Sequence, residues 1–277
     1  MYDPFLRGYF SKVNIAALLT CYNRVEITMR CLKVLFGQRC NATLSVFLVD
    51  DASPDKTGER VKAEFPEVNV IMGTGSLFWT KGMNLAWKTA GECWDAVLWL
   101  NDDVELKDGA IAGLMADADA TEWKGAIVGS FVDGEGKMTY GVMENWKWIE
   151  PLGRPRLTDG DISGNLVLVP KKVVEKVGIM ADCYSHAYGD YDYSARMRKA
   201  GVPYYLASHV CGRCDNDKPD YALESKSLLE RVNCLFQPNG HNWRDAIVYR
   251  WRHYGLLRTI ITAIHVPYLV VKGSRAK

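Results

Sequence analysis

Short apolar runs alternate with amphipathic segments through the first hundred residues of the chain. The apolar runs have the length of strands and lie at residues 13–20, 44–51, 68–72 and 96–100. The segments between them carry apolar residues three or four positions apart, as helices do, and lie at 25–36, 53–65 and 81–90. Such alternation is typical of parallel strands joined by helices. The sequence therefore predicts an α/β fold with a mainly parallel central sheet flanked by helices.

Acidic side chains follow two of the predicted strands at the point where each strand ends. The stretch AVLWLNDDVEL brings Asn101, Asp102 and Asp103 directly after an apolar run, and Asp50 and Asp51 end the second run. A buried carboxylate is costly unless it is neutralised, hydrogen-bonded or bound to a cation. The later pair is therefore either the cap of a turn or a site for Mg²⁺ or Mn²⁺, which prefer carboxylate oxygens. Ligands of open α/β sheets bind where the strands end, so this edge is the candidate site.

The charge of the chain is unevenly distributed. The net charge is +1, but residues 241–277 carry seven Lys or Arg against one acid, so this tail is +6 and the first 240 residues are 1 − 6 = −5. A basic tail on a mildly acidic body predicts an anionic partner, either a membrane or a nucleic acid. No apolar stretch reaches the roughly 18 to 20 residues needed to span a bilayer, and the N-terminus shows no signal peptide. We therefore expect a protein that does not cross the membrane.

Eight cysteines are spaced irregularly, at positions 21, 31, 40, 93, 183, 211, 214 and 234. In a chain of this length they do not form the disulfide framework of a small secreted domain, so reduced thiols are expected. Cys211 and Cys214 have the C-x-x-C spacing of a zinc site, with His209 beside them, but no second pair follows at a suitable distance. Structural zinc is therefore not expected.

Six short motifs follow one another in the order of a known family. They are LLTCYNR, VDDASPDKT, NDDV, ISGNLVLVPKKVVEKVG, GDYDYSARMRKAG and ASHVCG. Together they resemble the family 2 glycosyltransferases of the GT-A fold over roughly residues 13–215, and the rhamnosyltransferase-like members in particular. The resemblance implies an inverting enzyme of the hexosyltransferase type, which moves a sugar from a nucleotide diphosphate donor to a hydroxyl group.

The resemblance assigns a first group of residues to the nucleotide. These are Thr20, Tyr22, Asn23 and Arg24, with Asp50 or Asp51 accepting from the imide N–H of the base. Asn101 is also assigned to the nucleotide, and Asp102 contacts the ribose or supports the metal site from behind. A buried carboxylate reads an imide N–H well and would otherwise lack a partner. Asp51 could instead cap the following helix, for which Ser53 is also placed, before a helix start at Pro54. Asp50 is harder to explain as a cap.

The segment GTGSLFWTKGMNLAW, at residues 73–87, resembles a loop of one subgroup of the family. The residues implied near the diphosphate or the sugar are Gly75, Gly82 and Asn84. Trp79 is implied to stack on the base or the sugar, and Lys81 to bind the nucleotide. Plain core packing explains Trp79 equally well, because tryptophan is commonly mostly buried.

Asp103 is implied as the ligand of a divalent metal, with His209 near the metal or the phosphate. A metal at this position would act on the leaving diphosphate as a Lewis acid and a template. A lone histidine is more often structural, so the role of His209 rests on the resemblance.

Asp190 matches the position of the general base of the family. Gly189 stands where the family usually has a glutamate, so which carboxylate acts stays open, and Asp192 is the second candidate. Both acids are also placed to cap the helix that follows them. A positioned carboxylate that takes a proton in the transition state contributes roughly 10² to 10⁴-fold.

Residues 1–215 are expected to form the catalytic domain, with a nucleotide-binding half at about 13–105 and an acceptor half at about 125–215. Residues 216–277 are expected to form a basic, amphipathic helical extension. The expected cofactor is Mn²⁺ or Mg²⁺, the donor a UDP- or dTDP-sugar, and the acceptor a glycan or lipid-linked glycan in bacterial surface polysaccharide synthesis. No nucleic acid partner is expected.

Two other functions compete with this interpretation. A nucleotidyltransferase also combines an α/β sheet, a nucleotide and a carboxylate-bound metal, but it typically has a glycine-rich phosphate loop after the first strand, where this chain has TCYNRVE. A non-catalytic binding protein built on a GT-A-like fold is the second alternative, which the departure at Gly189 keeps open.

The tail at residues 243–277 is expected to hold the enzyme on the cytoplasmic face of the cell membrane. Trp251, Tyr254, Leu257 and Ile261 recur at helical spacing with arginines nearby, which predicts an amphipathic helix on anionic lipid. Pro267 is expected to break or kink a helix in the uncharged stretch that follows. The alternative is that this helix packs on the sheet or on a second subunit of a homo-oligomer.

Overall fold

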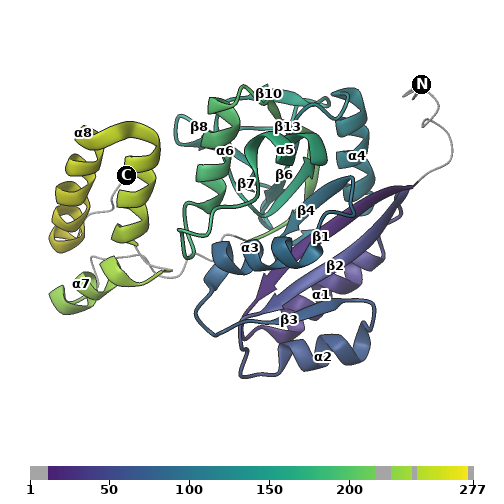
Figure 1. Ribbon diagram of the computed structural model, residues 1–277, viewed down its shortest axis with the longest axis horizontal. Helices are drawn as coiled ribbons and strands as arrows, with labels where there is room; N and C mark the ends of the chain where they lie inside the picture. The colour runs from purple at the N-terminus through teal and green to yellow at the C-terminus, as the bar shows by residue number, and fades with distance from the viewer. Residues whose placement is uncertain (1–11, 216–225, 239–241, 274–277) are drawn as a thin grey trace.

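The computed structural model describes residues 12–215, 226–238 and 242–273 (Figure 1). Ten strands form one sheet: β1 (Val13–Cys21), β2 (Ala42–Asp50), β3 (Asn69–Met72), β4 (Ala96–Leu100), β5 (Glu105–Leu106), β6 (Ala126–Val132), β7 (Met138–Tyr140), β10 (Arg156–Thr158), β12 (Leu166–Pro170) and β13 (Tyr204–Arg213). The main path is β10-β13-β6-β12-β4-β1-β2-β3, while β5 pairs with β13 and β7 with β6. A small second sheet contains β8 (Val142–Glu144), β9 (Lys147–Trp148) and β11 (Asp161–Ile162).

The strands β3, β2, β1 and β4 are parallel, as the sequence predicts for the first hundred residues. β12 then runs antiparallel to both of its neighbours, β4 and β6. The expected α/β fold is confirmed, with a sheet that is parallel in its N-terminal half and mixed in the other half.

Helices cover both faces of the sheet. The helices α1 (Val25–Phe36), α2 (Thr57–Glu64) and α4 (Ala110–Ala120) pack on one face, and α3 (Phe78–Ala90), α5 (Lys171–Val177) and α6 (Gly189–Lys199) on the other. Alternate residues of β1 enter different cores: Leu19 packs in the core with α1, and Leu18 in the core with α3. This two-sided burial explains why the β1 sequence is apolar throughout.

Two helices begin at positions other than those predicted. α2 begins at Thr57 and not near Pro54, and Ser53 does not cap it; the residue before the helix is Lys56, which has a positive φ of 59°. Asp55 accepts hydrogen bonds from the backbone N and the hydroxyl of Thr57, at 3.1 and 2.6 Å, so it satisfies the start of the helix instead. α3 begins at Phe78, three residues earlier than expected.

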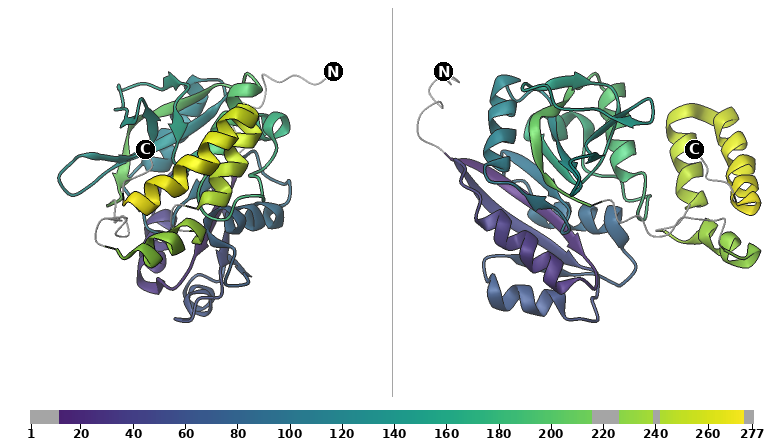
Figure 2. Two further views of the ribbon diagram at one scale, coloured as in Figure 1. Left: turned by 90° about the vertical axis from the view of Figure 1, so that its left-hand side faces the viewer. Right: turned by 180° about the vertical axis from the view of Figure 1, so that it is seen from behind.

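The C-terminal part contains α7 (Leu228–Phe236) and α8 (Trp243–Lys272). Figures 1 and 2 show α8 as two limbs that lie side by side and run in opposite directions, because the backbone leaves the helical conformation at Gly255, with φ 79° and ψ −178°. We call residues 243–254 the inner limb and residues 256–272 the outer limb. The helix passes through Pro267, so the expected break lies at Gly255 instead. The predicted stripe from Trp251 to Ile261 is therefore divided between the limbs.

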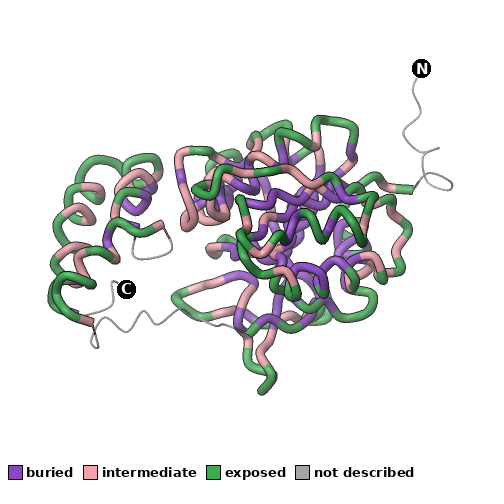
Figure 3. Tube along the Cα trace, turned by 90° about the horizontal axis from the view of Figure 1, so that it is seen from below, coloured by how far each residue is buried: buried purple, intermediate pink, exposed green. Residues whose placement is uncertain are grey.

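By length and composition α8 is apolar enough to cross a membrane, and only 6% of its most apolar window is buried. The expectation that no segment is long and apolar enough to span a bilayer is therefore wrong for α8 as a whole. The turn at Gly255 divides the helix, however, and the outer limb of 17 residues is about 26 Å long, which is shorter than a hydrocarbon core of about 30 Å. Figure 3 shows that buried residues concentrate in the α/β body while the C-terminal helices are largely exposed.

The last strand of the main sheet ends at Arg213, two residues before the predicted domain boundary at 215. The division of the chain into a catalytic domain and an extension stays a prediction.

Candidate active site

The negative charge of the acid pair after β4 is compensated by the guanidinium of Arg24, which follows β1. Nη1 of Arg24 lies 3.3 Å from Oδ1 of Asp102 and 3.1 Å from Oδ2 of Asp103, and the hydroxyl of Thr28 donates to Oδ2 of Asp102 at 2.8 Å. Burial raises the pKa of Asp102 to about 7, against the opposing effect of Arg24, and the neighbouring Asp103 adds to the rise. The pair is thus a buried acid beside a more open one, whose side chain is 39% exposed.

The acids after β2 hold loops through backbone N–H groups. Asp51 accepts from Gly75, Leu77 and Phe78 at 2.8, 2.8 and 3.0 Å, which fixes the start of α3. Asp50 accepts from the backbone N of Ser53 at 2.9 Å and of Gly58, in the first turn of α2, at 2.8 Å. The cap interpretation therefore needs correction. Asp50, and not Asp51, bonds the first turn of the following helix, α2, whereas Asp51 bonds the start of α3. The contact of either acid with a base stays a prediction.

A chain of contacts connects the acid pair with Asp190. Nε1 of Trp79 donates to Oδ1 of Asn101 at 2.7 Å, and the backbone N of Gly164 donates to Oδ2 of Asp190 at 3.1 Å. The ring of Trp79 lies directly against Gly164, where a Cβ atom would overlap it. Trp79 also makes an edge-to-face contact with Trp99 in the core, with ring centroids 6.5 Å apart. Trp79 therefore packs in the core and also borders the candidate site.

Asp190 has the environment of a general base. Its carboxylate accepts from the backbone N of Tyr191 at 2.9 Å as well as from Gly164. Burial raises the pKa of Asp190 to about 6, although these two hydrogen bonds oppose the rise, and Asp161 raises it further. A carboxylate with a pKa near the working pH is well matched to proton transfer.

Gly189 is explained by its neighbour on α3. A Cβ atom at position 189 would lie 2.6 Å from both Oγ1 and Cγ2 of Thr80. Thr80 is fully buried, and its hydroxyl donates to the carbonyl of His186 at 2.9 Å, so it has no room to move. Any side chain at position 189 would therefore clash with Thr80, which explains why this chain has glycine where the family usually has glutamate.

Asp192 is not available as a base. Its side chain is fully buried, and it accepts hydrogen bonds from Arg196, Arg252, His253 and Tyr184 at 2.7 to 3.1 Å. Although burial alone would raise the pKa of Asp192, the hydrogen bond from His253 and the charge of Arg196 hold it below its usual range. The second candidate is thus corrected to a structural acid, and Asp190 remains the candidate base.

Several predicted nucleotide residues are used inside the protein. The amide of Asn84 is buried and donates to the carbonyl of Met180, and Gly82 packs against Thr20, whose side chain a Cβ atom would overlap. We correct the expectation that Asn84 and Gly82 face the diphosphate. Gly75, with φ 81°, belongs to the loop held by Asp51.

Other predicted nucleotide residues remain accessible. Tyr22 is 53% exposed at the end of β1, and Lys81 in the first turn of α3 is half-buried. Asn23 has a positive φ of 53°, and its backbone N donates to the hydroxyl of Ser53 at 2.9 Å. This contact joins the loops after β1 and β2.

His209 does not lie beside Asp103. β5 and β13 are antiparallel, with Glu105 opposite Arg213 and the backbone N of Lys107 bonded to the carbonyl of Cys211. Residue 209 therefore lies about six residues beyond Asp103 along this ladder, or roughly 20 Å at 3.4 Å per residue. The expectation of a metal ligand at His209 needs correction for this reason.

The described residues contain no group of three or more His, Cys, Asp or Glu side chains arranged to hold a metal. Asp102 and Asp103 nevertheless supply two carboxylates, and Arg24 already places a positive charge between them. Mg²⁺ is commonly held by one or two protein carboxylates with substrate phosphates and water completing its shell. The pair fits an ion that is shared with a diphosphate, but not a complete protein cage.

No disulfide joins the eight cysteines. Cys211 and Cys214 are buried in the core beneath α1 and α4 and do not belong to a metal cluster of described residues. The expectation of reduced thiols agrees with the absence of disulfides, and the expectation of no structural zinc stays a prediction.

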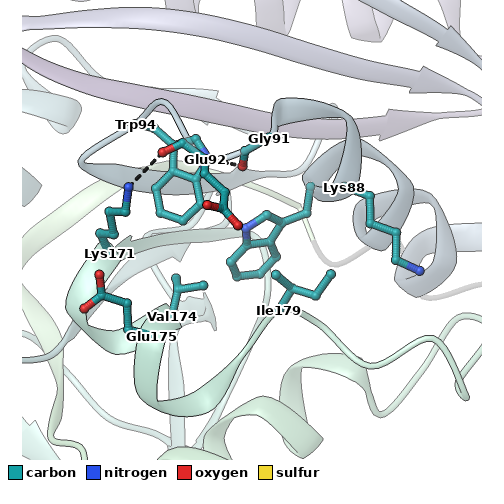
Figure 4. Close-up of a pocket in the computed structure, with 9 residues that line it drawn as sticks. Lys88, Gly91, Glu92, Trp94, Lys171, Val174, Glu175 and Ile179 are labelled. Atoms are coloured by element: carbon teal, nitrogen blue, oxygen red, sulfur yellow. Dashed lines mark hydrogen bonds between the residues drawn. The ribbon is translucent and has the colours of Figure 1, made fainter.

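A cavity of about 400 Å³ lies away from the candidate site (Figure 4). Its lining includes Trp94, Lys171, Glu175 and Trp87, near the start of β4 and the end of β12, which is the sheet edge opposite Asp103. Trp87 and Trp94 are only 1% and 7% exposed, so the protein already covers most of their rings. The acidic side chains and their hydrogen bonds at the edge that carries Asp103 define the candidate active site better than this cavity does.

Some site residues have no clear signal in the sequence. Gly164 lies in the ISGN motif, but its contact with Trp79 joins positions 85 residues apart. Arg252 and His253 belong to the tail that the sequence predicts to be a membrane anchor, yet both contact Asp192. Their basic character alone does not distinguish a buried partner from a lipid surface.

The family description "Glycosyl transferase family 2" matches residues 17–178, more than half of the chain. The chain belongs to glycosyl transferase family 2. It is therefore a glycosyltransferase that uses a nucleotide-sugar, and the nucleotidyltransferase alternative is not supported. A comparison with curated proteins finds no match.

Solved glycosyltransferases share the fold. Residues 1–349 of S. aureus TarS match with a TM-score of 0.58 at 17% identity, covering 93% of this chain and 81% of that chain. The same fragment in complex with UDP-GlcNAc gives 0.58 at 12% identity, covering 95% and 82%. A mannosyltransferase from Pyrobaculum calidifontis, in complex with GDP-Man and Mn²⁺, gives 0.53 at 15% identity, covering 96% and 73%. At these identities the likeness concerns the fold alone.

Proposed function

We propose that this family 2 enzyme is an inverting glycosyltransferase in which Asp190 is the general base. The observation that carries the proposal is the raised pKa of Asp190, about 6, together with its connection through Gly164 and Trp79 to the acid pair. A base and a site for a negatively charged leaving group are the two requirements of inverting transfer.

In the proposed reaction, Asp190 is ionised above pH 6 and accepts the proton of the acceptor hydroxyl. The hydroxyl oxygen forms a bond to the anomeric carbon on the side opposite the nucleotide. The bond from that carbon to the diphosphate oxygen breaks, and its electron pair leaves with the nucleoside diphosphate. Attack from the opposite side inverts the configuration of the sugar.

We propose that Asp103 and the buried Asp102 hold Mn²⁺ or Mg²⁺ together with the diphosphate. When bound, the ion supplies Lewis-acid stabilisation of the leaving group. Arg24, now 3.1 Å from Asp103, would then turn its charge toward the diphosphate. The Mn²⁺ in the complex of the Pyrobaculum calidifontis mannosyltransferase supports this choice of cofactor.

The proposed donor is a UDP- or dTDP-sugar, and the proposed acceptor is a glycan or lipid-linked glycan of a bacterial surface polysaccharide. Structures of the same fold with UDP-GlcNAc and with GDP-Man support a nucleotide diphosphate sugar as the donor class. A lipid-linked acceptor agrees with the character of the outer limb of α8.

We further propose that the outer limb docks the enzyme on the anionic cytoplasmic face of the cell membrane. Its exposed apolar side chains begin with Leu256. The others recur at helical spacing and are Leu257, Ile260, Ile261, Ile264, Tyr268 and Val271. Arg258 and Lys272 lie on the same limb and provide charge complementary to anionic lipid. A second copy of the chain on this face, which would form a homo-oligomer, is the competing occupant.

A nucleotide-sugar panel tests the proposed function. Wild-type protein with Mn²⁺ should release nucleoside diphosphate faster when acceptor is added, and Asp190→Asn should lose most of this transfer, by roughly 10² to 10⁴-fold. Nucleotide binding, measured by calorimetry, should be retained in the variant. Asp182→Asn, which changes an acid whose side chain is 74% exposed and does not contact Asp190, is the control. Full transfer by Asp190→Asn would exclude Asp190 as the base.

A further inference from the structure

We propose that the inner limb of α8 belongs to the active site, because Tyr249, Arg252 and His253 act as positioning residues for Asp190. This inference rests on the proposed role of Asp190 as the base. It assigns a second role to a tail whose outer limb is proposed to contact lipid.

The residues two positions before and two positions after Asp190 are both held by the inner limb. Tyr188 stacks against Tyr249, with ring centroids 5.2 Å apart. Asp192 accepts from Nε of Arg252 at 3.1 Å and contacts Nε2 of His253 at 2.8 Å. Asp190 therefore lies between two anchors that come from 60 residues further along the chain.

The backbone before Asp190 needs such support. Tyr188 has a positive φ of 69°, which is unfavourable for a residue with a large side chain, and it does not cap α6 through its side chain. Conformations of this kind are strained and persist only where the surroundings hold them. The tyrosine contact from the inner limb is one of those surroundings.

The anchor at Asp192 is built as a closed polar cluster. His253 is 4% exposed, and burial lowers its pKa, so the ring is neutral and donates through Nε2. Its Nδ1 has no hydrogen-bond partner among the described residues, which a protonated ring would need. The first turn of α6 is thus tied to α8 by a neutral donor and by the charge of Arg252.

A third contact extends the same arrangement toward α3. Asp245 of the inner limb accepts from the backbone N and the hydroxyl of Ser185, at 2.7 and 2.8 Å. The carbonyl of Ser185 accepts from the backbone N of Thr80 at 3.0 Å, one residue after Trp79. The inner limb therefore supports the loop between α5 and α6, which in turn bonds the first turn of α3.

The test compares His253→Leu with His265→Leu in the full chain. Both variants remove a histidine of α8, but His265 is exposed on the outer limb. His265→Leu removes a histidine that does not contact α6, so a pH profile that changes only in His253→Leu reports a moved Asp190. Transfer should fall roughly 100-fold in kcat, as a misplacement of about 1 Å can produce, with donor KM within about twofold.

The pH profile and hydrogen exchange separate positioning from mere stability. At saturating Mn²⁺, which would favour the ionised form of Asp102, wild-type transfer should lose activity below pH 6, where Asp190 is protonated; Asp161 is the acid that faces Asp190 from β11. In His253→Leu a loosened first turn exposes Asp190, so the acid limb should move to lower pH. Amide exchange at residues 188–193 should accelerate, whereas His265→Leu should match wild type in every measurement.

Conservative variants and a second substitution keep the test decisive. His253→Gln keeps a donor of similar reach and should recover most of the transfer. If His253→Leu does not fold, Arg252→Met, from a side chain that is 41% exposed, should show the same loss of kcat. Unchanged amide exchange and pH profile in a folded variant would overturn the inference. Absence of transfer in wild type would instead refute the proposed function, while the exchange experiment would still report on the positioning.

Discussion

Asp102 and Asp103 are neighbours with different exposure, and this difference assigns their roles. Asp102 is 4% exposed and is bonded to Thr28 and Arg24, whereas the Asp103 side chain is 39% exposed and open to a further ligand. A change at Asp103 therefore tests metal binding with the smaller effect on folding.

Asp103→Asn keeps the size of the side chain and removes its charge. We expect transfer with saturating Mn²⁺ to fall at least about 100-fold, because the ion that stabilises the leaving group is lost, while the thermal unfolding midpoint stays close to wild type. Glu105→Gln, which changes an exposed acid two residues away, is the control and should remain active. Full activity of Asp103→Asn in EDTA would show that the metal assignment is wrong.

At the scale of secondary-structure elements, the contact between α3 and α6 decides where the base lies. Gly189→Ala would place a methyl group 2.6 Å from the buried Thr80, and such overpacking costs about 1–3 kcal/mol. Thr80→Ala removes both atoms that clash. We therefore expect the double variant Thr80→Ala/Gly189→Ala to be more stable than the sum of the single effects predicts, by about 1 kcal/mol or more.

Urea unfolding of the four proteins measures this coupling, and transfer rates show whether relief of the clash also restores the site. Gly113→Ala, at a glycine of α4 that has no positive φ and open space around it, is the control for a glycine change outside the contact. Simple additivity of the two changes would mean that Thr80 does not exclude a side chain at position 189.

The elements near the site differ in how far the sequence could predict them. The acids at the ends of β2 and β4 could be identified because a charge after an apolar run needs a partner. The partners themselves could not, since Asp51 binds backbone N–H groups 24 to 27 residues away. His209 was misplaced because the register of β5 and β13 depends on pairing that one sequence does not show. Likewise Gly255, a single glycine in a helical pattern, gives less warning of a break than Pro267 does.

At the scale of the whole molecule, the two limbs of α8 have different surroundings. The inner limb contacts α6 and the loop before it, whereas the outer limb presents its apolar side chains to solvent. Removal of the tail would therefore disturb the proposed active site together with any membrane contact. Point substitutions on the outer limb are the cleaner test of docking.

Leu257→Glu and Ile264→Glu place a negative charge in the middle of the exposed apolar face, at side chains that are 72% and 69% exposed. Wild-type protein should sediment with vesicles of anionic phospholipid at low salt, because each basic residue near such a surface contributes about 1 kcal/mol and the apolar face adds to it. Both variants should remain in the supernatant and keep their transfer rate on a soluble acceptor. Leu157→Glu, at a leucine of β10 that is 64% exposed, makes the same change on the catalytic body and should sediment like wild type. Wild-type protein that ignores the vesicles but elutes as a dimer, with the dimer lost in Leu257→Glu, would assign the face to a second copy of the chain.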